Sequence, residues 1–455
     1  MQIRSLIPTL TNNKWSLWAL LTLMYLTFLF FRVPIAFDNF WGEDGSVFYN
    51  GIINDGVLKS VFTLTAGYYL LIDWLVAIPI SVLPVEVATV GNAVLVAVII
   101  GLIYTKIFSL LRIFVEDVYS RFVLVLLMMY MPIACFDSIG AATGLHFVLN
   151  TTSMFIYART LSGRKLSASD KFVLILSLLS GPLSLYCLSI FILFISRSKQ
   201  SLVKIWNSFN FVIIAAVLQI GYIVFGVLTR SRGLGDESSI TKTLYLFLER
   251  VIGFNMVPGW SSVDSSTAKE LGFNSLLSRA IFLLLIISFF LFLYASNYRF
   301  TPKPMIRPEL YVFVTSLIYW FVSGYLFNPE PRYAFLPACG FIILFFRTAG
   351  LYLSRLSLSS KSKGKLRVLS ISRGLLLCLP IAIVFFNSFP SNLRTEGDSL
   401  RIQLERNIDN CRDGNADTLI SIVVRPARNN ATVELRCEWI NSNSLRHKGS
   451  FVFQE

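Results

Sequence analysis

The sequence predicts an all-α polytopic membrane protein with about nine to eleven transmembrane spans and a small β-containing domain at its C-terminal end. Apolar residues make up 55% of the chain and charged residues only 15%, and the mean hydropathy is +0.65, which excludes an ordinary soluble enzyme. Several apolar runs reach the roughly 20 residues that a helix needs to cross a bilayer. Basic residues gather between alternate runs, and the segment after residue 390 differs in composition from everything before it.

The apolar runs divide the chain into spans and one long early loop. The first predicted span covers residues 15–36, and the outer segment 37–84 follows it. Part of that segment, residues 68–84, is apolar but contains Asp73 and two prolines, so it either spans, re-enters the bilayer or lies along its surface. Further spans are expected near residues 85–105, 119–135, 144–160, 206–228, 275–296, 309–327, 333–353 and 373–390.

The run 172–195 has basic residues at both ends, Lys171 on one side and Arg197 on the other. If both flanks are cytoplasmic, the chain must turn at Gly181-Pro182, as a broken or re-entrant pair of helices. Non-helical backbone at that depth is tolerated where it lines protein or a cavity. The number of spans therefore depends on how this run and residues 68–84 fold.

The net charge of +14 is explained by topology and needs no nucleic-acid partner. The segments placed on the cytoplasmic side hold 21 of the 40 Lys and Arg residues and only three carboxylates, namely Glu116, Asp117 and Asp170. This asymmetry follows the positive-inside rule and puts the N-terminus in the cytoplasm and the C-terminus outside. The short loops and small tail indicate a bacterial inner-membrane protein.

The tail predicts a second domain, residues 391–455, after a membrane domain of residues 1–390. It has nine basic and nine acidic residues and is therefore neutral. The stretch "LISIVVRPARNNATVELRCEW" predicts two short strands joined by a turn. Cys411 and Cys437 are the cysteines of this tail, and an oxidising outer compartment favours a disulfide between them over two separate thiols.

Polar residues near span ends fall on the outer face and are candidate functional groups. Glu43 and Asp44 follow the first span in "FDNFWGEDGSVFYNGIINDG". Neighbouring residues point in different directions, so the two do not form a matched pair, and one carboxylate directed into a cavity could take a proton from an attacking hydroxyl. The alternative is a solvated acidic loop at the membrane surface.

Arg332 and His146 are the other candidates with a stated chemistry. A guanidinium at headgroup level, next to Tyr333, suits a phosphate through charge-assisted hydrogen bonds, unless it is only an interfacial anchor. His146 begins a span, where a structural hydrogen bond is the alternative to ligand binding. No zinc-like cluster exists in the sequence, no cofactor is expected, and nothing supports a divalent cation, although carboxylates could bind one.

Four motifs together resemble the GT-C superfamily, the multi-span glycosyltransferases that take sugars from polyprenyl-phosphate carriers. They occur in the expected order along nearly the whole chain. They are the acidic outer loop "WGEDGSVFYNGIINDG" followed by "GYYLLIDWL", the polar span start "GLHFVLN", the Gly-Pro segment "LLSGPLSLYCLSIFIL", and "PRYAFLPACGFIILFF". The neutral tail with its cysteine pair is similar to the small terminal domain of bacterial members, but it is very small, which leaves the acceptor open.

The resemblance implies an inverting transfer of a sugar from a polyprenyl-phosphate-linked donor to a glycan or lipid-linked acceptor at the outer membrane face. It implies that Asp44 is the catalytic base, with Glu43 positioning substrate or sharing that role. Arg332 and Tyr333 would bind the donor phosphate, and His146 would contact the sugar or the phosphate. The loop 229–274, which carries Arg250, would cover the site and contact substrate.

Three other readings remain open from the sequence. An O-antigen-type polysaccharide polymerase or ligase also uses outer loops with several arginines, and the loop 229–274 holds Arg230, Arg232 and Arg250. A transporter of lipid-linked saccharides would show repeated halves and polar residues at mid-bilayer, which this sequence does not show. A purely structural membrane protein would need neither Asp44 nor Arg332.

Overall fold

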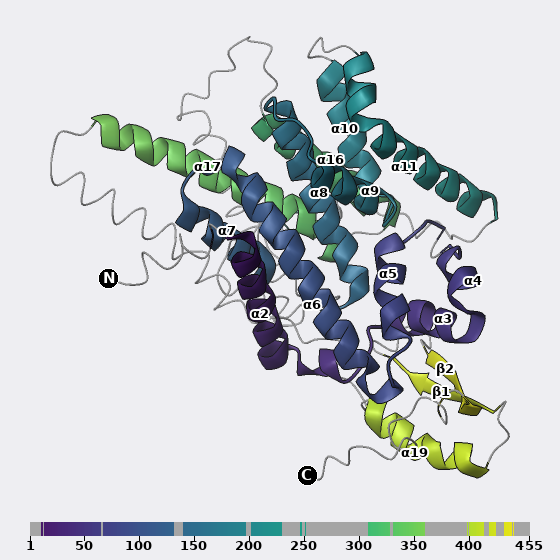
Figure 1. Ribbon diagram of the computed structural model, residues 1–455. Coiled ribbons are helices and arrows are strands. Elements are labelled where there is room, and N and C mark those ends of the chain that lie inside the picture. The colour runs from purple at the N-terminus through teal and green to yellow at the C-terminus, as the bar shows by residue number, and fades with distance from the viewer. Residues whose placement is uncertain are drawn as a thin grey trace, which may run out of the picture.

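A computed structural model gives the fold of the chain (Figure 1). It describes residues 11, 13–64, 67–131, 140–196, 202–229, 246–247, 251, 308–327, 331–359, 398, 400–413, 418–424, 432–438 and 440. This part of the protein is mostly helical, with one small two-stranded sheet. The predicted spans 275–296 and 373–390 lie outside the described residues.

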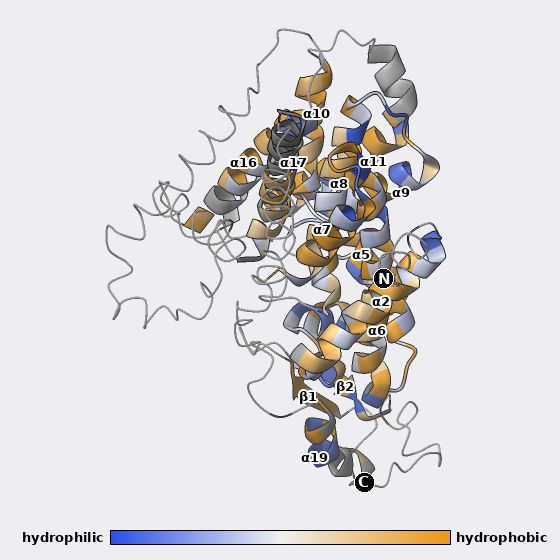
Figure 2. Cartoon of the chain, turned by 90° about the vertical axis from the view of Figure 1, so that its left-hand side faces the viewer, coloured by the Kyte–Doolittle hydropathy of each residue, from blue (hydrophilic) through white to orange (hydrophobic). Residues whose placement is uncertain are grey.

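Three described helices are long and apolar enough to cross a membrane, at Lys14–Phe31, Glu86–Ile113 and Phe209–Leu228. In Figure 2, α2 and α6 are coloured mainly as hydrophobic, whereas hydrophilic residues are more frequent in α19. The helices that coincide with predicted spans are α2 (Lys14–Arg32), α6 (Val85–Leu110), α7 (Val118–Tyr130), α8 (Leu145–Leu161), α11 (Leu202–Leu228), α16 (Pro308–Phe327) and α17 (Phe335–Ser359).

Helices α2 and α6 pack closely because a glycine lies at their contact. A Cβ atom on Gly101 would lie 2.1 Å from Thr22 Oγ1 and 3.1 Å from the Thr22 backbone nitrogen, so any larger residue would push the helices apart. The Trp18 indole Nε1 also donates a hydrogen bond of 3.2 Å to the Val98 carbonyl across the same contact. Helix α2 is thereby fixed against α6.

Helix α8 is the central helix of the bundle. Fourteen consecutive residues, Leu145 to Ala158, are buried, so the helix is covered on all sides. It contacts α6, α9, α10, α16 and α17. One of its buried polar residues is joined to α9, since Asn150 Oδ1 accepts a hydrogen bond of 3.1 Å from Ser177 Oγ.

The two segments that the sequence allows either to span or to re-enter the membrane, residues 68–84 and 172–195, form short helices. Residues 68–84 contain α5 (Leu71–Ile80), whose 10 residues extend about 15 Å, half of what a span requires. The run 172–195 is broken as the sequence indicates, into α9 (Ala168–Leu178) and α10 (Ser184–Ser196). Between them Gly181 has a φ of +150°, which glycine tolerates far better than other residues.

The two interrupted segments meet each other. The backbone N–H of Leu71 donates a hydrogen bond of 2.9 Å to the Leu179 carbonyl. The next N–H, that of Ile72, donates a hydrogen bond of 3.0 Å to Ser180 Oγ. The start of α5 thereby satisfies backbone and side-chain groups at the break after α9, as a non-helical segment inside a bundle requires.

The C-terminal segment forms a helix and a hairpin. Strands β1 (Leu419–Val423) and β2 (Thr432–Arg436) pair antiparallel, with Ser421 opposite Glu434, which confirms the two predicted strands. The connecting residues 425–431 lie outside the described part. The disulfide between Cys411 and Cys437 is also confirmed and joins this hairpin to α19 (Leu400–Asp413).

Candidate functional site

The acidic motif lies at the start of a π-helix. Residues Asp44–Tyr49 form this helix, and α3 (Asn50–Asp55) continues directly from it. π-Helical turns are rare and occur frequently at functional sites. Asp44, Gly45, Phe48 and Tyr49 of this helix are all buried.

The carboxylate of Asp44 is held by three hydrogen-bond donors. Its Oδ2 accepts from the backbone N–H of Ala142 at 2.7 Å and from Asn92 Nδ2 at 3.2 Å, and its Oδ1 accepts from the backbone N–H of Thr143 at 3.1 Å. Ala142 and Thr143 begin the short 3-10 turn Ala142–Gly144 that leads into α8. The start of a helix presents N–H groups and favours an anion, so this environment suits an ionised, proton-accepting carboxylate.

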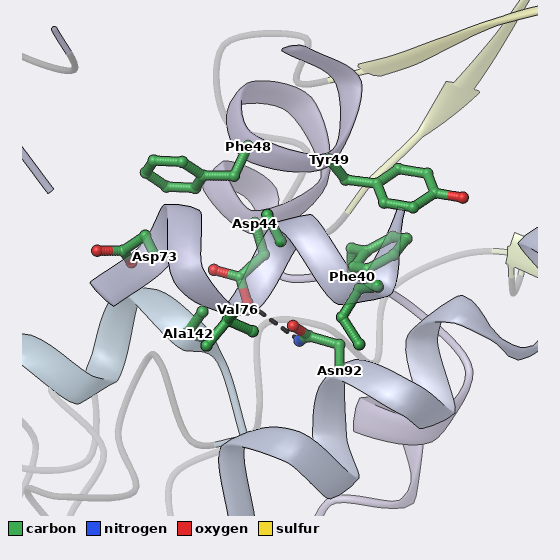
Figure 3. A pocket seen from close by; sticks show the side chains of 10 residues that line it. Phe40, Asp44, Phe48, Tyr49, Asp73, Val76, Asn92 and Ala142 are labelled. Carbon is green, nitrogen blue, oxygen red and sulfur yellow. Dashed lines mark hydrogen bonds between the residues drawn. The ribbon is translucent and has the colours of Figure 1, made fainter. Parts of the chain in front are cut away.

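Asp44 lines a small cavity together with a second acid, Asp73 of α5 (Figure 3). The cavity has about 10 Å³ of free space, roughly what one water molecule or hydroxyl group needs. In the view of Figure 3, Asp44 lies between Asn92 and Asp73. The remaining lining residues are Phe40, Phe48, Tyr49, Val76, Ala77, Ile80 and Ala142.

Asp73 has an unusual environment for an acidic residue. Its side chain is fully buried, and no other described residue makes a hydrogen bond to either of its carboxyl oxygens. Burial raises the pKa of Asp73 well above its ordinary value of 3.8, and the neighbouring charges of Asp44 and Glu43 raise it further. Helix α5, which carries this acid, packs against the turn that carries Asp44 and against α6.

Glu43 and Asp44 point in different directions, as expected for neighbouring residues. Asp44 is 4% exposed and lines the cavity, whereas Glu43 is half-buried and is not among the lining residues. Glu43 still acts electrostatically on Asp73. Of the two predicted acids, Asp44 is therefore the one that a group inside the cavity would meet.

His146 lies in the first turn of α8, next to the break between α9 and α10. A Cβ atom on Gly181 would lie 3.7 Å from His146 Cδ2, which is ordinary van der Waals contact. The ring of the adjacent Phe147 packs edge-on against Tyr333, with 5.6 Å between the ring centroids. The polar start of α8 thus contacts both the Gly-Pro segment and the Arg-Tyr motif.

The four sequence motifs therefore converge. Asp44 of the acidic loop bonds the turn before α8, His146 of α8 lies against Gly181, and Phe147 of α8 packs on Tyr333. Arg332 belongs to the 3-10 turn Pro331–Ala334 beside Tyr333, but its side chain lies outside the described part. Arg250, with the rest of residues 248–250, lies outside the described residues altogether.

The C-terminal segment contacts the acidic loop directly. A Cβ atom on Gly45 would lie 2.8 Å from Val424 Cγ1 and 3.2 Å from Val433 Cγ2, so only glycine fits beside Asp44 at this contact. The N–H of Leu400 donates a hydrogen bond of 3.3 Å to the Asp38 carbonyl. Figure 1 shows β1, β2 and α19 at the same end of the molecule as α3 and α4.

Sequence reasoning missed Asp73 and Asn92 as site residues. In the sequence, Asp73 interrupts an apolar segment, and Asn92 lies inside the run "VEVATVGNAVLVAVII". A polar residue inside an apolar span is itself a functional signal, and this signal could have identified both. Among the described residues, no group of three or more His, Cys, Asp or Glu side chains could hold a metal ion.

Neither a protein-family model nor a curated protein matches the sequence. The functional assignment therefore depends on the residues and contacts described above.

Proposed function

We propose that the protein is a polytopic membrane glycosyltransferase that moves a sugar from a polyprenyl-phosphate donor to a glycan or lipid-linked acceptor, with inversion. The observation that carries this proposal is the position of Asp44. A buried carboxylate, held by three donors at the start of α8, lies where four motifs from distant parts of the chain meet. Such an arrangement supports a fixed general base.

In the proposed reaction the acceptor hydroxyl attacks the anomeric carbon of the donor sugar. Its proton passes to Asp44, the new carbon–oxygen bond forms, and the bond from the anomeric carbon to the phosphate oxygen breaks. The polyprenyl phosphate leaves with the electron pair of that bond. Asp44 is suited to the first step because it is acceptor-only when ionised and cannot rotate away from its three donors.

The other predicted residues take roles around the departing phosphate and the sugar. Arg332 would stabilise the negative charge that develops on the phosphate, and Tyr333 would hold its turn against Phe147. His146, at the junction of α8 with the Gly181 break, would contact the sugar or the phosphate. Glu43 would position the acceptor from outside the cavity.

The proposal includes the membrane topology. The N-terminus would be cytoplasmic, and the acidic loop and the C-terminal domain would face outward in a bacterial inner membrane. Two findings support this sidedness. The C-terminal segment and the acidic loop, both predicted to be outside, are in contact, and Lys106 and Arg159, both predicted to be cytoplasmic, converge on Asp170.

The first test is native mass spectrometry of the full-length protein purified from its own membranes, beside Asp44→Asn and Arg332→Ala. The Asn variant removes the proton acceptor, and losing a general base costs about 100-fold or more in rate. We expect Asp44→Asn to retain a polyprenyl-phosphate sugar, wild type to carry mostly polyprenyl phosphate, and Arg332→Ala to carry less of either.

Asp55→Asn is the matched control, since Asp55 is an exposed acid of the same outer segment and pairs with Lys59 at 2.6 Å. It should carry the same lipids as wild type. The proposal would be wrong if wild type and Asp44→Asn both carried only bulk phospholipid, or if Asp44→Asn turned over an added donor at the wild-type rate.

A transporter of lipid-linked saccharides is the second candidate, because two interrupted helical segments meet beside buried acids. A transporter would carry the same intact lipid-linked saccharide in wild type and in Asp44→Asn, without released polyprenyl phosphate. The accumulation of the intact donor in the variant alone therefore separates the enzyme from the transporter.

A further inference from the structure

A second carboxyl group, Asp73, has no part in the mechanism above although it lines the same cavity as Asp44. Its side chain is 0% exposed, and its two oxygens receive no hydrogen bond from any other described residue. An ionised carboxylate in such a place would lack a hydrogen-bond donor from the described part of the protein, which is costly. A buried polar group without a partner at a candidate site calls for a ligand.

Among the residues that the structure describes, no lysine or arginine is placed to offset Asp73. None of the ten residues that line the cavity is basic. The lysines and arginines with a described ion pair on the helices packed against α5 are engaged elsewhere: Lys59 of α4 pairs with Asp55, while Lys106 of α6 and Arg159 of α8 pair with Asp170. The histidine of α8, His146, lies against Gly181. Lys171 is the neighbour of Asp170 in the chain, and Glu86 of α6 would add only negative charge.

The two acids of the cavity therefore differ in what surrounds them. Asp44 accepts three hydrogen bonds from N–H groups, and these bonds stabilise its ionised form. Asp73 has none of these donors and lies in the field of Asp44 and Glu43. When two carboxyl groups share a site, the group whose surroundings better stabilise a negative charge ionises. The other group keeps its proton.

We propose that Asp73 is a substrate-contacting residue that stays a neutral carboxylic acid and donates a hydrogen bond to an oxygen atom of the donor sugar. This inference rests on the proposed function. Asp73 lies between the Asp44 cavity and the junction of α5 with Leu179 and Ser180, and that junction adjoins Gly181 and His146. The cavity has room for about one hydroxyl group, so a single sugar hydroxyl held there by Asp73 would bring the sugar next to Asp44.

The protonation state can be measured without substrate, by infrared spectroscopy of the full-length protein in lipid nanodiscs. At neutral pH we expect a carbonyl stretching band of a protonated carboxyl group in wild type. Asp73→Asn should lack this band, and Asp55→Asn should keep it. In Asp44→Asn the band should persist but disappear at a lower pH than in wild type, because a neighbouring negative charge is gone.

A spectrum of Asp73→Asn that equals that of wild type would overturn the proposal, since Asp73 would then be ionised. If Asp73→Asn does not fold, the Asp44→Asn spectra still decide, because Asp73 is intact there. A band that titrates at the same pH in wild type and Asp44→Asn would mean that the proton is held elsewhere, and this outcome also overturns the proposal.

The contact with the sugar is tested with two added lipids, undecaprenyl-phosphate glucose and undecaprenyl phosphate. Asp73→Leu cannot donate a hydrogen bond, so its affinity for the sugar-bearing lipid should fall about tenfold, with affinity for undecaprenyl phosphate unchanged. Asp73→Asn keeps a neutral donor and should change neither affinity by more than about threefold. If Asp73→Leu lowered the affinity for both lipids equally, Asp73 would have only a structural role.

The failure of this proposal can be distinguished from the failure of the proposed function. If wild type binds neither lipid, the glycosyltransferase assignment and the sugar contact both fail, while the infrared band still reports whether Asp73 is protonated. If wild type binds both lipids but Asp73→Leu behaves like wild type, the proposed function stands and the role of Asp73 is rejected.

Discussion

Asn54 donates a hydrogen bond of 2.9 Å from Nδ2 to the backbone carbonyl of Glu434, which lies 380 residues further along the chain. The N–H of the same Glu434 donates at 2.8 Å to Asn50 Oδ1, one helical turn before Asn54 on α3. Two amide side chains on one helix face therefore pair with the outer edge of β2 as a further strand would. The helix that continues from the Asp44 segment is thereby attached to the C-terminal domain.

Replacing Asn54 by Ala should loosen β2 from α3. The variant loses the hydrogen bond to Glu434 and a second hydrogen bond of 2.9 Å to Asn50 Oδ1. The domain should therefore become less stable by about 1 kcal/mol. Asn50→Ala should lower the stability of the domain by at least as much. Faster hydrogen exchange at residues 432–438 measures this loss. Glu434→Ala is the control, because both hydrogen bonds use the backbone of Glu434 and should remain in this variant. Equal exchange rates in Asn54→Ala, Asn50→Ala and Glu434→Ala would contradict the prediction.

Replacing Gly45 by Ala tests the contact of the domain with the loop that carries Asp44. The added methyl group would lie 2.8 Å from Val424 Cγ1 and 2.9 Å from Phe40 Cβ, so the hairpin or the loop must shift. We expect a loss of about 1–3 kcal/mol in stability, measured by thermal unfolding, and a lower rate of sugar transfer.

Gly221→Ala is the control for that substitution, because a Cβ atom there meets nothing within 4 Å and helix α11 gains a better helix former. Adding Val424→Ala to Gly45→Ala should restore part of the lost stability by removing the closest contact. A Gly45→Ala protein as stable and active as wild type would show that the hairpin does not constrain this loop.

Several features could be predicted because they leave a local signal in the sequence. The strands around "RPARNNA" alternate in character, Gly181-Pro182 interrupts an apolar run, and Cys411 and Cys437 are the cysteines of a polar tail. Helix α19 was missed, although Leu400, Leu404 and Cys411 are buried on one face at helical spacing. In a short polar segment that carries a cysteine, this spacing is too weak a pattern to predict a helix.

The arrangement of the site could be predicted only in part. Asp44 rather than Glu43 lines the cavity, and no sequence pattern distinguishes these two neighbouring acids or predicts the π-helix that begins at Asp44. The pairing of Asn54 with Glu434 and the position of Asp73 beside Asp44 join segments that are distant in sequence. Such contacts depend on how the bundle closes, and hydrophobic periodicity does not report them.

Removing the disulfide should destabilise the C-terminal domain specifically. Cys411 and Cys437 are 26 residues apart, and closing a loop of that length stabilises a domain by about 3 kcal/mol in the chain-entropy model. The double variant Cys411→Ser, Cys437→Ser should show faster exchange throughout the hairpin and lose its response to a reductant. Cys187→Ala changes a buried free cysteine of the bundle and should leave the hairpin unaffected. Equal exchange in wild type with and without reductant would contradict this prediction.

The Asp170 cluster predicts an acid-dependent loss of stability at the opposite end of the bundle. Asp170 is buried at the start of α9, where it pairs with Lys106 of α6 at 2.7 Å and with Arg159 of α8. Burial acts to raise the pKa of Asp170, but hydrogen bonds from Lys106 and Ser167 outweigh it, so the pKa lies below its ordinary value of 3.8.

A lowered pKa means that the folded state favours the ionised form more than the unfolded state does. The contribution of Asp170 is therefore present above its unfolded pKa and is lost as the pH falls through the folded pKa, below about 3.8. Asp170→Asn should lower the free energy of unfolding by about 3–5 kcal/mol at neutral pH, because it leaves Lys106 and Arg159 without their counter-ion. The free energy of unfolding of this variant should also depend less on pH in the acid range than that of wild type.

Thermal unfolding of the protein in nanodiscs, measured between pH 7 and acid, checks both effects. Lys59→Gln is the control, since its pair with Asp55 is exposed, with side chains 72% and 48% accessible, and should contribute less than about 1 kcal/mol. If Asp170→Asn unfolds at the wild-type temperature at neutral pH, the ion pairs that join α6, α8 and α9 do not stabilise the bundle. In that case its acid sensitivity must come from other carboxylates.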